Sequence, residues 1–316
     1  MESLRTRTAA TNLGGARGYR PLEGKLAIVT GASRGIYLSN IFSDFSNRSP
    51  GIGLAVSHNL ASKGASLILN YTSDSSAKPT NDLSALLTEQ HEITCLVIQA
   101  DMGSANGPAH IINTAKNHFS HPKTGKFQID IIINNAGVSK NLPIQDCTTE
   151  DFDWQYKINV LGPLLLMQAA LPYLPHDRSG RIVNMSSVSS SEGFIQQSVY
   201  GGTKAALEAM TRTWARELAE RATVNAVNPG PVNTDMWAGT APIFQAALKP
   251  FIQHTPGSAI RPELDDADLV ADAEKAGGRP AYVDEIAGVV AMLCTADALW
   301  CTGQVVCANG GMRMAM

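Results

Sequence analysis

The sequence predicts an α/β fold, a single domain built on one doubly wound parallel sheet of about seven strands. Short runs of β-branched and other apolar residues alternate with longer segments of helical period, as expected for parallel strands joined by covering helices. The chain has 316 residues, and its 44% hydrophobic content is enough to fill one sizeable core. The domain is expected over residues 22–316, after a disordered tail at residues 1–21.

The predicted strands are short, and several end in Gly, Asn or Asp, which is typical of strands that close in a turn. They are residues 26–30, 66–70, 94–99, 129–134, 181–185, 223–228 and 304–307. The segments between them carry the helical period, and a late helix is expected to begin near Val283.

Two segments interrupt this alternation. Residues 37–52 are rich in Ser, Asn, Asp and Phe, and they fall where the first helix should form. Residues 235–278 lie between the sixth strand and the late helix, and they predict a long excursion over the surface. We expect this second segment to be a substrate lid, whose apolar side chains line a pocket or, more commonly, pack the lid down.

Composition excludes several classes of function. The formal net charge of -3, with 17% charged residues, lacks the basic field of a nucleic-acid-binding protein, so small molecules are the expected partners. No apolar run approaches the roughly 20 residues that a membrane span needs. The five cysteines form no CxxC pair and no metal-ligand cluster with histidine, which predicts a cytoplasmic protein without a metal site.

A glycine-rich turn follows the first predicted strand. It contains Thr30, Gly31, Ser33, Arg34 and Gly35, and glycine recurs at Gly51 and Gly53. Such a turn lets backbone amides and a helix N-terminus approach a pyrophosphate, because no Cβ blocks the ligand. Tight turns are also glycine-rich for conformational reasons alone, so this turn by itself indicates nucleotide binding only weakly.

A more specific group, Ser187, Tyr200 and Lys204, follows the fifth predicted strand. Tyr200 and Lys204 are four residues apart, so on a helix they share one face. A phenol titrates at about 10 in water, and a neighbouring ammonium is expected to draw the pKa of Tyr200 toward working pH, where the phenol can exchange a proton. Ser187 can bond the same substrate oxygen. In isolation, such a Tyr–Lys pair can also merely cover a helix surface.

In their order along the chain, these motifs resemble the short-chain dehydrogenase/reductase family, and the resemblance extends over residues 22–312. The matching segments are Thr30-Gly31, Asn134-Asn135-Ala136-Gly137, Asn159, Ser187, Tyr200 to Lys204, Pro229-Gly230 and Asn309-Gly310-Gly311. In the last of these, Asn309 stands where the family more often has Asp. The resemblance implies a Rossmann-like fold.

The resemblance also implies roles for individual residues. Tyr200 would be the general acid in reduction, Lys204 would tune it and hold the cofactor ribose, and Ser187 would orient the carbonyl. Asn159 would anchor a water that leads to Lys204. The implied cofactor-binding residues are Gly31, Ser33, Arg34, Gly35, Gly53, Asn70, Asp101, Met102, Asn134, Asn135, Ala136, Gly137, Tyr200, Lys204, Pro229, Gly230, Val232 and Thr234, with Asp101 and Met102 facing the adenine.

Charge at the end of the second predicted strand favours NADP(H) over NAD(H). Readers of NAD commonly place an acid there to bind the ribose 2′-hydroxyl, but this chain has Asn70, Tyr71, Thr72 and Ser73. Arg34 in the glycine turn could pair with a 2′-phosphate. Arg34 could equally be an ordinary solvated surface charge.

Residues 37–52 depart from the family pattern, in which the glycine turn runs without a break. Because Gly35-Ile36 is repeated as Gly51-Ile52, the additional residues could equally be 35–50. The turn can bind a cofactor only if Gly31 comes together with Gly51 or Gly53, and closing the intervening loop costs entropy. The repeated Gly-Ile, with the family pattern intact on either side, favours the hypothesis that this segment is a translated intervening sequence or an error in the gene model.

The expected activity is NADPH-dependent reduction of a ketone to a secondary alcohol. The carbonyl substrate is a small molecule, such as a 3-oxoacyl thioester bound to a carrier protein or CoA, or a polyketide-like ketone, and the family favours a homo-oligomer, specifically a homotetramer. The competing hypothesis is a nucleotide-binding protein of the same fold whose catalysis is impaired by residues 37–52. A methyltransferase would have no use for the Tyr–Lys pair.

Overall fold

The computed structural model describes residues 19–32 and 51–314. In these ranges seven strands form one parallel sheet in the order β3-β2-β1-β4-β5-β6-β7. The strands are β1 (Leu26–Val29), β2 (Ser66–Tyr71), β3 (Cys95–Gln99), β4 (Ile131–Asn134), β5 (Gly180–Met185), β6 (Ala222–Pro229) and β7 (Val305–Ala308). All seven strands predicted from the sequence are confirmed, with ends that differ by one or two residues.

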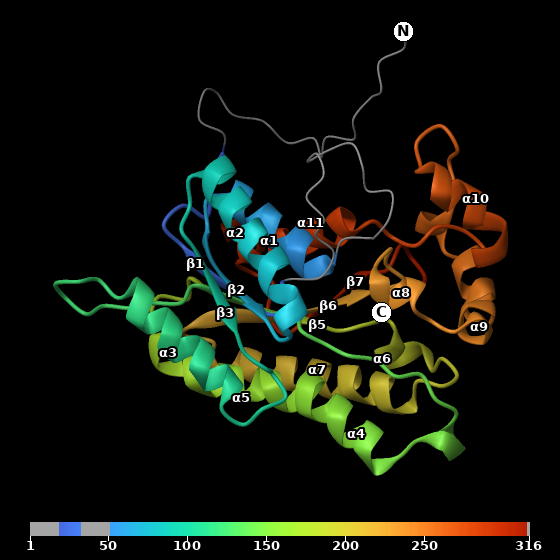
Figure 1. Ribbon diagram of the computed structural model, residues 1–316, viewed down its shortest axis with the longest axis horizontal. Helices are drawn as coiled ribbons and strands as arrows, with labels where there is room; N and C mark the ends of the chain where they lie inside the picture. Colours follow the sequence, from blue (N-terminus) through green and yellow to red (C-terminus); the bar gives the residue numbers. More distant parts are fainter. Residues whose placement is uncertain (1–18, 33–50, 315–316) are drawn as a thin grey trace, which may run out of the picture.

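Helices cover both faces of the sheet, so the predicted doubly wound fold is confirmed (Figure 1). One face carries α1 (Ile52–Ser62), α2 (Ala77–His91) and α11 (Val283–Cys294). The other carries α3 (Gly107–Phe119), α5 (Gly162–Ala170) and α7 (Ser198–Glu217), with α4 (Thr149–Tyr156) at the end of this layer. The predicted late helix therefore begins at Val283.

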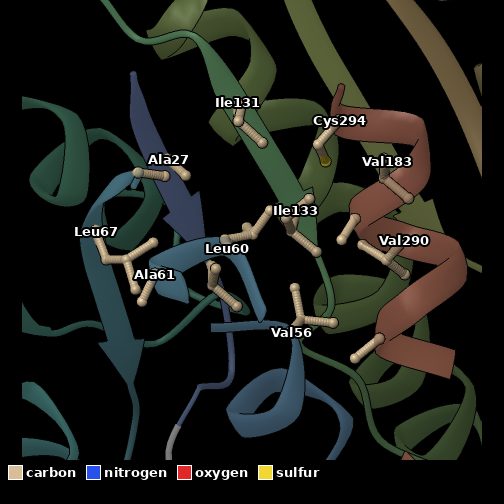
Figure 2. Packing of buried hydrophobic residues seen from close by; sticks show 14 of the residues in the cluster. Ala27, Val56, Leu60, Ala61, Leu67, Ile131, Ile133, Val183, Val290 and Cys294 are labelled. Atoms are coloured by element: carbon tan, nitrogen blue, oxygen red, sulfur yellow. The ribbon is translucent and has the colours of Figure 1, made fainter. Parts of the chain in front are cut away.

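The apolar character of the strands follows from burial on both faces. On the first face, Val56 and Leu60 of α1 pack with Ile133 of β4 and Val290 of α11, as Figure 2 shows. On the second, Ile28, Ile132 and other strand residues pack against α3, α5 and α7. A strand covered twice needs apolar side chains in both directions, which produces continuous apolar runs such as the three isoleucines that begin β4.

Residues 235–278, predicted as an excursion over the surface, form helices α8 (Asp235–Ala238), α9 (Pro242–Gln253) and α10 (Ala267–Ala276) at one side of the sheet (Figure 1). Phe244, Leu248 and Ile252 of α9 are buried in a small separate cluster. Arg279, just after this segment, is buried and pairs through both terminal nitrogens with the carboxylate of Glu285 at 2.8 Å. The excursion is thus packed and anchored, and its role as a lid stays a prediction.

The predicted tail, residues 1–21, lies mainly outside the described residues. At its end, Arg20 donates through Nη1 to the carbonyl of His91 at 2.8 Å. Among the residues that the structure describes, no helix is long and apolar enough to cross a membrane. Within 19–32 and 51–314, no group of three or more His, Cys, Asp or Glu residues is arranged to bind a metal ion.

Candidate active site

The carboxyl ends of neighbouring strands β1, β4 and β5 form the edge at which the site is built. The strand order runs outward from β1 to β3 on one side and from β4 to β7 on the other. In doubly wound sheets, ligands bind beyond the carboxyl ends of the strands at this point of reversal. The glycine turn follows β1, the Asn135-Ala136-Gly137 segment follows β4, and Ser187 follows β5. The sequence-predicted groups are therefore brought to one edge.

Tyr200 and Lys204 lie in the first two turns of α7, and both are buried. The Nζ atom of Lys204 lies 5.6 Å from the centre of the Tyr200 ring and donates to the carbonyl of Met185 at 2.8 Å. The hydroxyl of Ser187 hydrogen-bonds with the Tyr200 phenol. The predicted proton-transfer group is thus assembled, with Ser187 delivered by β5 and the other two by α7.

Burial sets the protonation of this group. Desolvation raises the pKa of Tyr200 to about 12, and the hydrogen bond with Ser187 acts in the opposite direction. Desolvation also lowers the pKa of Lys204 to about 8. The expectation that the ammonium draws the pKa of Tyr200 toward working pH is wrong for the protein alone, because removing the phenolate from water is the largest effect.

Asn159 lies in a π-helical turn, Lys157–Leu161, between α4 and α5. Its Oδ1 accepts from Val138 N at 2.9 Å, and its Nδ2 donates to Val138 O at 2.8 Å and to Thr203 Oγ1 at 3.0 Å. A Cβ on Gly137 would lie 3.4 Å from Lys204 Nζ and 3.5 Å from Asn159 Oδ1. Asn159 therefore joins the segment after β4 to the helix that carries Lys204. π-Helical turns are frequent at functional sites.

The described residues of the glycine turn, before residue 33 and after residue 50, lie close together. Gly31 has a φ of +65°, and a Cβ on Gly53 would lie 2.4 Å from the Gly31 carbonyl oxygen. Gly51 is the N-cap of α1, and Gly53 lies in the first helical turn. Gly31 and Gly53 thus meet as the sequence argument required. Because Gly51 and Ile52 belong to the helix entry, this arrangement favours assigning the additional residues to 35–50.

Asn135 fixes this turn to the end of β4. Its Nδ2 donates to the carbonyl oxygens of Thr30 at 2.8 Å and Gly31 at 3.2 Å. In return, the hydroxyl of Thr30 accepts from the backbone amides of Asn135 and Ala136, each at 3.0 Å. Asn134 is buried in the sheet and donates to Asn184 Oδ1 at 2.8 Å. Asn134 and Asn135 thus bond protein groups of the turn and sheet.

Asn70 is fully buried at the end of β2. Its Oδ1 accepts from Gly31 N at 3.4 Å, and its Nδ2 donates to Ala100 O at 3.0 Å. The side chain therefore braces the turn instead of facing solvent. The exposed polar residues begin at Thr72 and Ser73 and continue with Asp74, whose Oδ1 accepts from Gln99 Nε2 at 2.7 Å. Met102 is also buried, whereas Asp101 is exposed and accepts from Gly103 N at 2.9 Å.

The remaining predicted cofactor-binding residues lie at the end of β6 and just after it. Pro229 O accepts from Val188 N at 2.8 Å, and Gly230 packs against Asn309. Val232 forms a bridge with Ala281, and Thr234 caps α8 by accepting from Trp237 N at 3.4 Å. The structure thus places them along the same edge of the sheet. Ser33, Arg34 and Gly35 lie outside the described residues.

Glu208, on α7, was missed by the sequence interpretation. Its Oε1 accepts from Ser186 Oγ at 2.6 Å and from Ser190 Oγ at 2.7 Å, on either side of Ser187. A signal existed in the sequence, because Glu208 is four residues beyond Lys204 and therefore shares its helix face.

Comparison with known proteins agrees with this geometry. The model of the short chain dehydrogenase family matches residues 48–242. L-Xylulose reductase of Aspergillus niger is 53% identical over 313 residues, which cover 93% of this chain and 99% of that protein. L-xylo-3-Hexulose reductase of Hypocrea jecorina is 48% identical over 317 residues, with 94% and 99% covered. A blue fluorescent protein from a metagenomic library, solved with NADPH, matches with a TM-score of 0.72 and 29% identity over 93% of this chain and 100% of that one.

Proposed function

Because the chain belongs to the short-chain dehydrogenase/reductase family, we propose that it reduces a small polyhydroxylated ketone to a secondary alcohol with NADPH. The observation that carries the proposal is the buried Tyr200 phenol, which hydrogen-bonds with Ser187 on the helix that carries Lys204. The ketose class is supported by two relatives, named as L-xylulose and L-xylo-3-hexulose reductases, that align over nearly their whole length.

The three side chains divide the work of reduction. With a pKa of about 12, Tyr200 keeps its proton at neutral pH and can donate it to the substrate oxygen. Ser187 bonds the same oxygen and fixes its position. Lys204, whose pKa is about 8, carries most of a positive charge at pH 7, and this charge stabilises the phenolate that remains after proton transfer. When bound, NADPH supplies the hydride to the carbonyl carbon.

The residues present fit a nicotinamide dinucleotide. Gly31 and Gly53 approach each other without a Cβ between them, and α1 begins at Ile52 with its N-terminus at the turn. A helix N-terminus at a glycine turn attracts a pyrophosphate. The first exposed side chains after β2, Thr72 and Ser73, are uncharged and would not repel a 2′-phosphate. The acid that follows them, Asp74, is exposed and accepts from Gln99 Nε2 at 2.7 Å. We therefore propose NADP(H), which also accompanies the metagenomic relative.

The ketose proposal is tested by following NADPH oxidation with L-xylulose and, at the same concentration, with an acetoacetyl thioester. We expect L-xylulose to be reduced faster, and we expect Tyr200→Phe to abolish the difference. A faster reaction with the thioester would favour the 3-oxoacyl substrate of the sequence interpretation. NADPH binding without oxidation of NADPH by either ketone would favour a catalytically impaired nucleotide-binding protein.

Other expectations from the sequence stay predictions. They are a carrier-protein-bound, CoA-bound or polyketide-like substrate, homotetramer formation and a cytoplasmic location.

A further inference from the structure

The carboxylate of Glu208 joins three elements around the active site. Its Oε1 accepts from Ser186 Oγ at 2.6 Å, Ser190 Oγ at 2.7 Å and, more weakly, Asn228 Nδ2 at 3.4 Å. Ser186 directly follows β5, Ser190 lies in the short helix α6 (Ser189–Glu192), and Asn228 lies in β6. The two short bonds have the lengths of hydroxyl-to-carboxylate hydrogen bonds, which are stronger than neutral ones.

The two serines flank the residue that touches the substrate oxygen. Ser187 lies between them. Beyond Tyr200, the bonds of its hydroxyl within residues 19–32 and 51–314 are local: it donates to Ser189 Oγ at 3.0 Å and accepts from Ser189 N at 3.2 Å. The position of the Ser187 hydroxyl is therefore set by the backbone of residues 186–190. We propose that Glu208 is a positioning residue, which holds this backbone segment so that Ser187 stays against the Tyr200 phenol.

The geometry of α7 places Glu208 on the same helix face as the catalytic pair. Tyr200, Lys204 and Glu208 follow one another at intervals of four on α7, so one helix face carries all three. The phenol, the ammonium and the carboxylate that holds the serine segment consequently move together with α7. Close packing supports the link, because a Cβ on Gly201 would lie 2.6 Å from the Ser189 carbonyl oxygen, leaving no room between α6 and α7.

A second connection extends from Glu208 to the last loop. Asn228 donates to Glu208, and its Oδ1 accepts from Asn309 Nδ2 at 3.5 Å. Asn309 is the position where the resembled family more often has Asp, which could not donate this bond. Asn309 thus donates to Asn228, which in turn donates to Glu208. Both hydrogen bonds are long and contribute less than the bonds from the two serines.

The test measures how Glu208 acts through Ser187. Glu208→Ala should lower kcat for L-xylulose reduction by about 10- to 100-fold, because a displacement of reacting groups by about 1 Å can cost that much. The KM for NADPH should stay within about 2-fold, since the bonds of Glu208 do not involve Gly31, Gly51 or Gly53, the described glycines of the turn. Glu208→Gln keeps an acceptor oxygen of the same reach and should retain more activity than Glu208→Ala.

A double-mutant cycle separates positioning from general stabilisation. In a Ser187→Ala background, Glu208→Ala should lower kcat by less than about 2-fold further, because the hydroxyl that it positions is already gone. In Glu208→Ala alone, the rate of alcohol oxidation should rise at a higher pH than in the wild type. The reason is that the hydrogen bond with Ser187 lowers the pKa of Tyr200, and this bond is expected to weaken. Glu217→Ala, on the exposed last turn of α7, is the matched control and should be unchanged.

The proposal rests on reductase activity but not on a particular ketone. Hydrogen exchange of the backbone amides tests it without any measurement of turnover. In Glu208→Gln and Glu208→Ala, the amides of residues 186–191 should exchange faster than in the wild type, while those of residues 53–62 should be unchanged. Equal kcat losses for Glu208→Ala with and without Ser187, or unchanged exchange at 186–191, would overturn the proposal. Absence of any ketone reduction by the wild type, with the exchange change present, would count only against the proposed function.

Discussion

The two halves of the active-site edge are held together in different ways. On the glycine-turn side, backbone meets backbone, because a Cβ on Gly53 would lie 2.4 Å from the carbonyl oxygen of Gly31. On the catalytic side, buried side chains bond one another, as Asn159 does with Thr203 at 3.0 Å and Ser186 with Glu208 at 2.6 Å. The first side requires the absence of a Cβ at Gly53, and the side chains of Asn70 and Asn135 brace it from outside. The second requires particular side chains at fixed helical spacing.

The largest effect should come from the catalytic side. Tyr200→Phe removes the proton donor but keeps the buried ring, so we expect kcat to fall by on the order of 10² or more, with little change in NADPH affinity. Turnover measured by NADPH oxidation, with affinity from NADPH fluorescence, provides the check. Near-normal turnover would show that another group supplies the proton.

The glycine side should fail through crowding instead. Gly53→Ala forces a Cβ against the backbone of Gly31, so we expect a loss of about 1–3 kcal/mol in unfolding free energy together with weaker NADPH binding. Gly288→Ala is a matched control in α11. Beyond the helix's own backbone, no described residue lies within 4 Å of the new Cβ, so the substitution should stabilise the protein by about 0.5–1 kcal/mol. Urea unfolding measures both. Equal effects of the two substitutions would refute the close approach at Gly53.

A smaller effect separates function from stability on the catalytic side. Burial lowers the pKa of Lys204 to about 8, so at pH 7 the folded state carries a desolvated ammonium. Its penalty is fully present below pH 8 and disappears as the pH rises toward the unfolded value of about 10.4. Lys204→Met should therefore abolish turnover but raise the unfolding free energy of the cofactor-free protein by about 1–2 kcal/mol at pH 7. A destabilised variant at pH 7, or a gain that persists at pH 10.5, would contradict this assignment.

The sequence predicted the features that depend on local pattern. Doubly covered strands are mainly apolar, so all seven were identifiable, and the spacing of Tyr200 and Lys204 predicted their shared helix face. Features that depend on three-dimensional neighbours were not accessible. Burial that raises the pKa of Tyr200 requires knowing what covers the ring. The inward orientation of Asn70 likewise depends on the turn above it and on Ala100 beside it.

Two further features lay between these cases. The apolar residues of segment 235–278 predicted a pocket lining or, more commonly, packing of the lid, but they did not predict the separate helices α8, α9 and α10. Glu208 had the right spacing from Lys204, yet its partners Ser186 and Ser190 come from another segment of the chain. The ketose class came from relatives, because the residues that distinguish one ketone from another carry no motif.

The central claim is that Gly31, Gly51 and Gly53 are the glycines that form the cofactor-binding turn, and that the length of the chain between Gly31 and Gly51 does not change this. Isothermal titration of NADPH into the full chain and into a variant lacking residues 35–50 tests it most directly. Deletion leaves Arg34 joined to Gly51, so we predict saturable binding by both proteins, tighter in the deletion variant because a larger fraction has a competent turn. Weaker binding after the deletion would contradict the account, since residues 35–50 would then belong to the cofactor site.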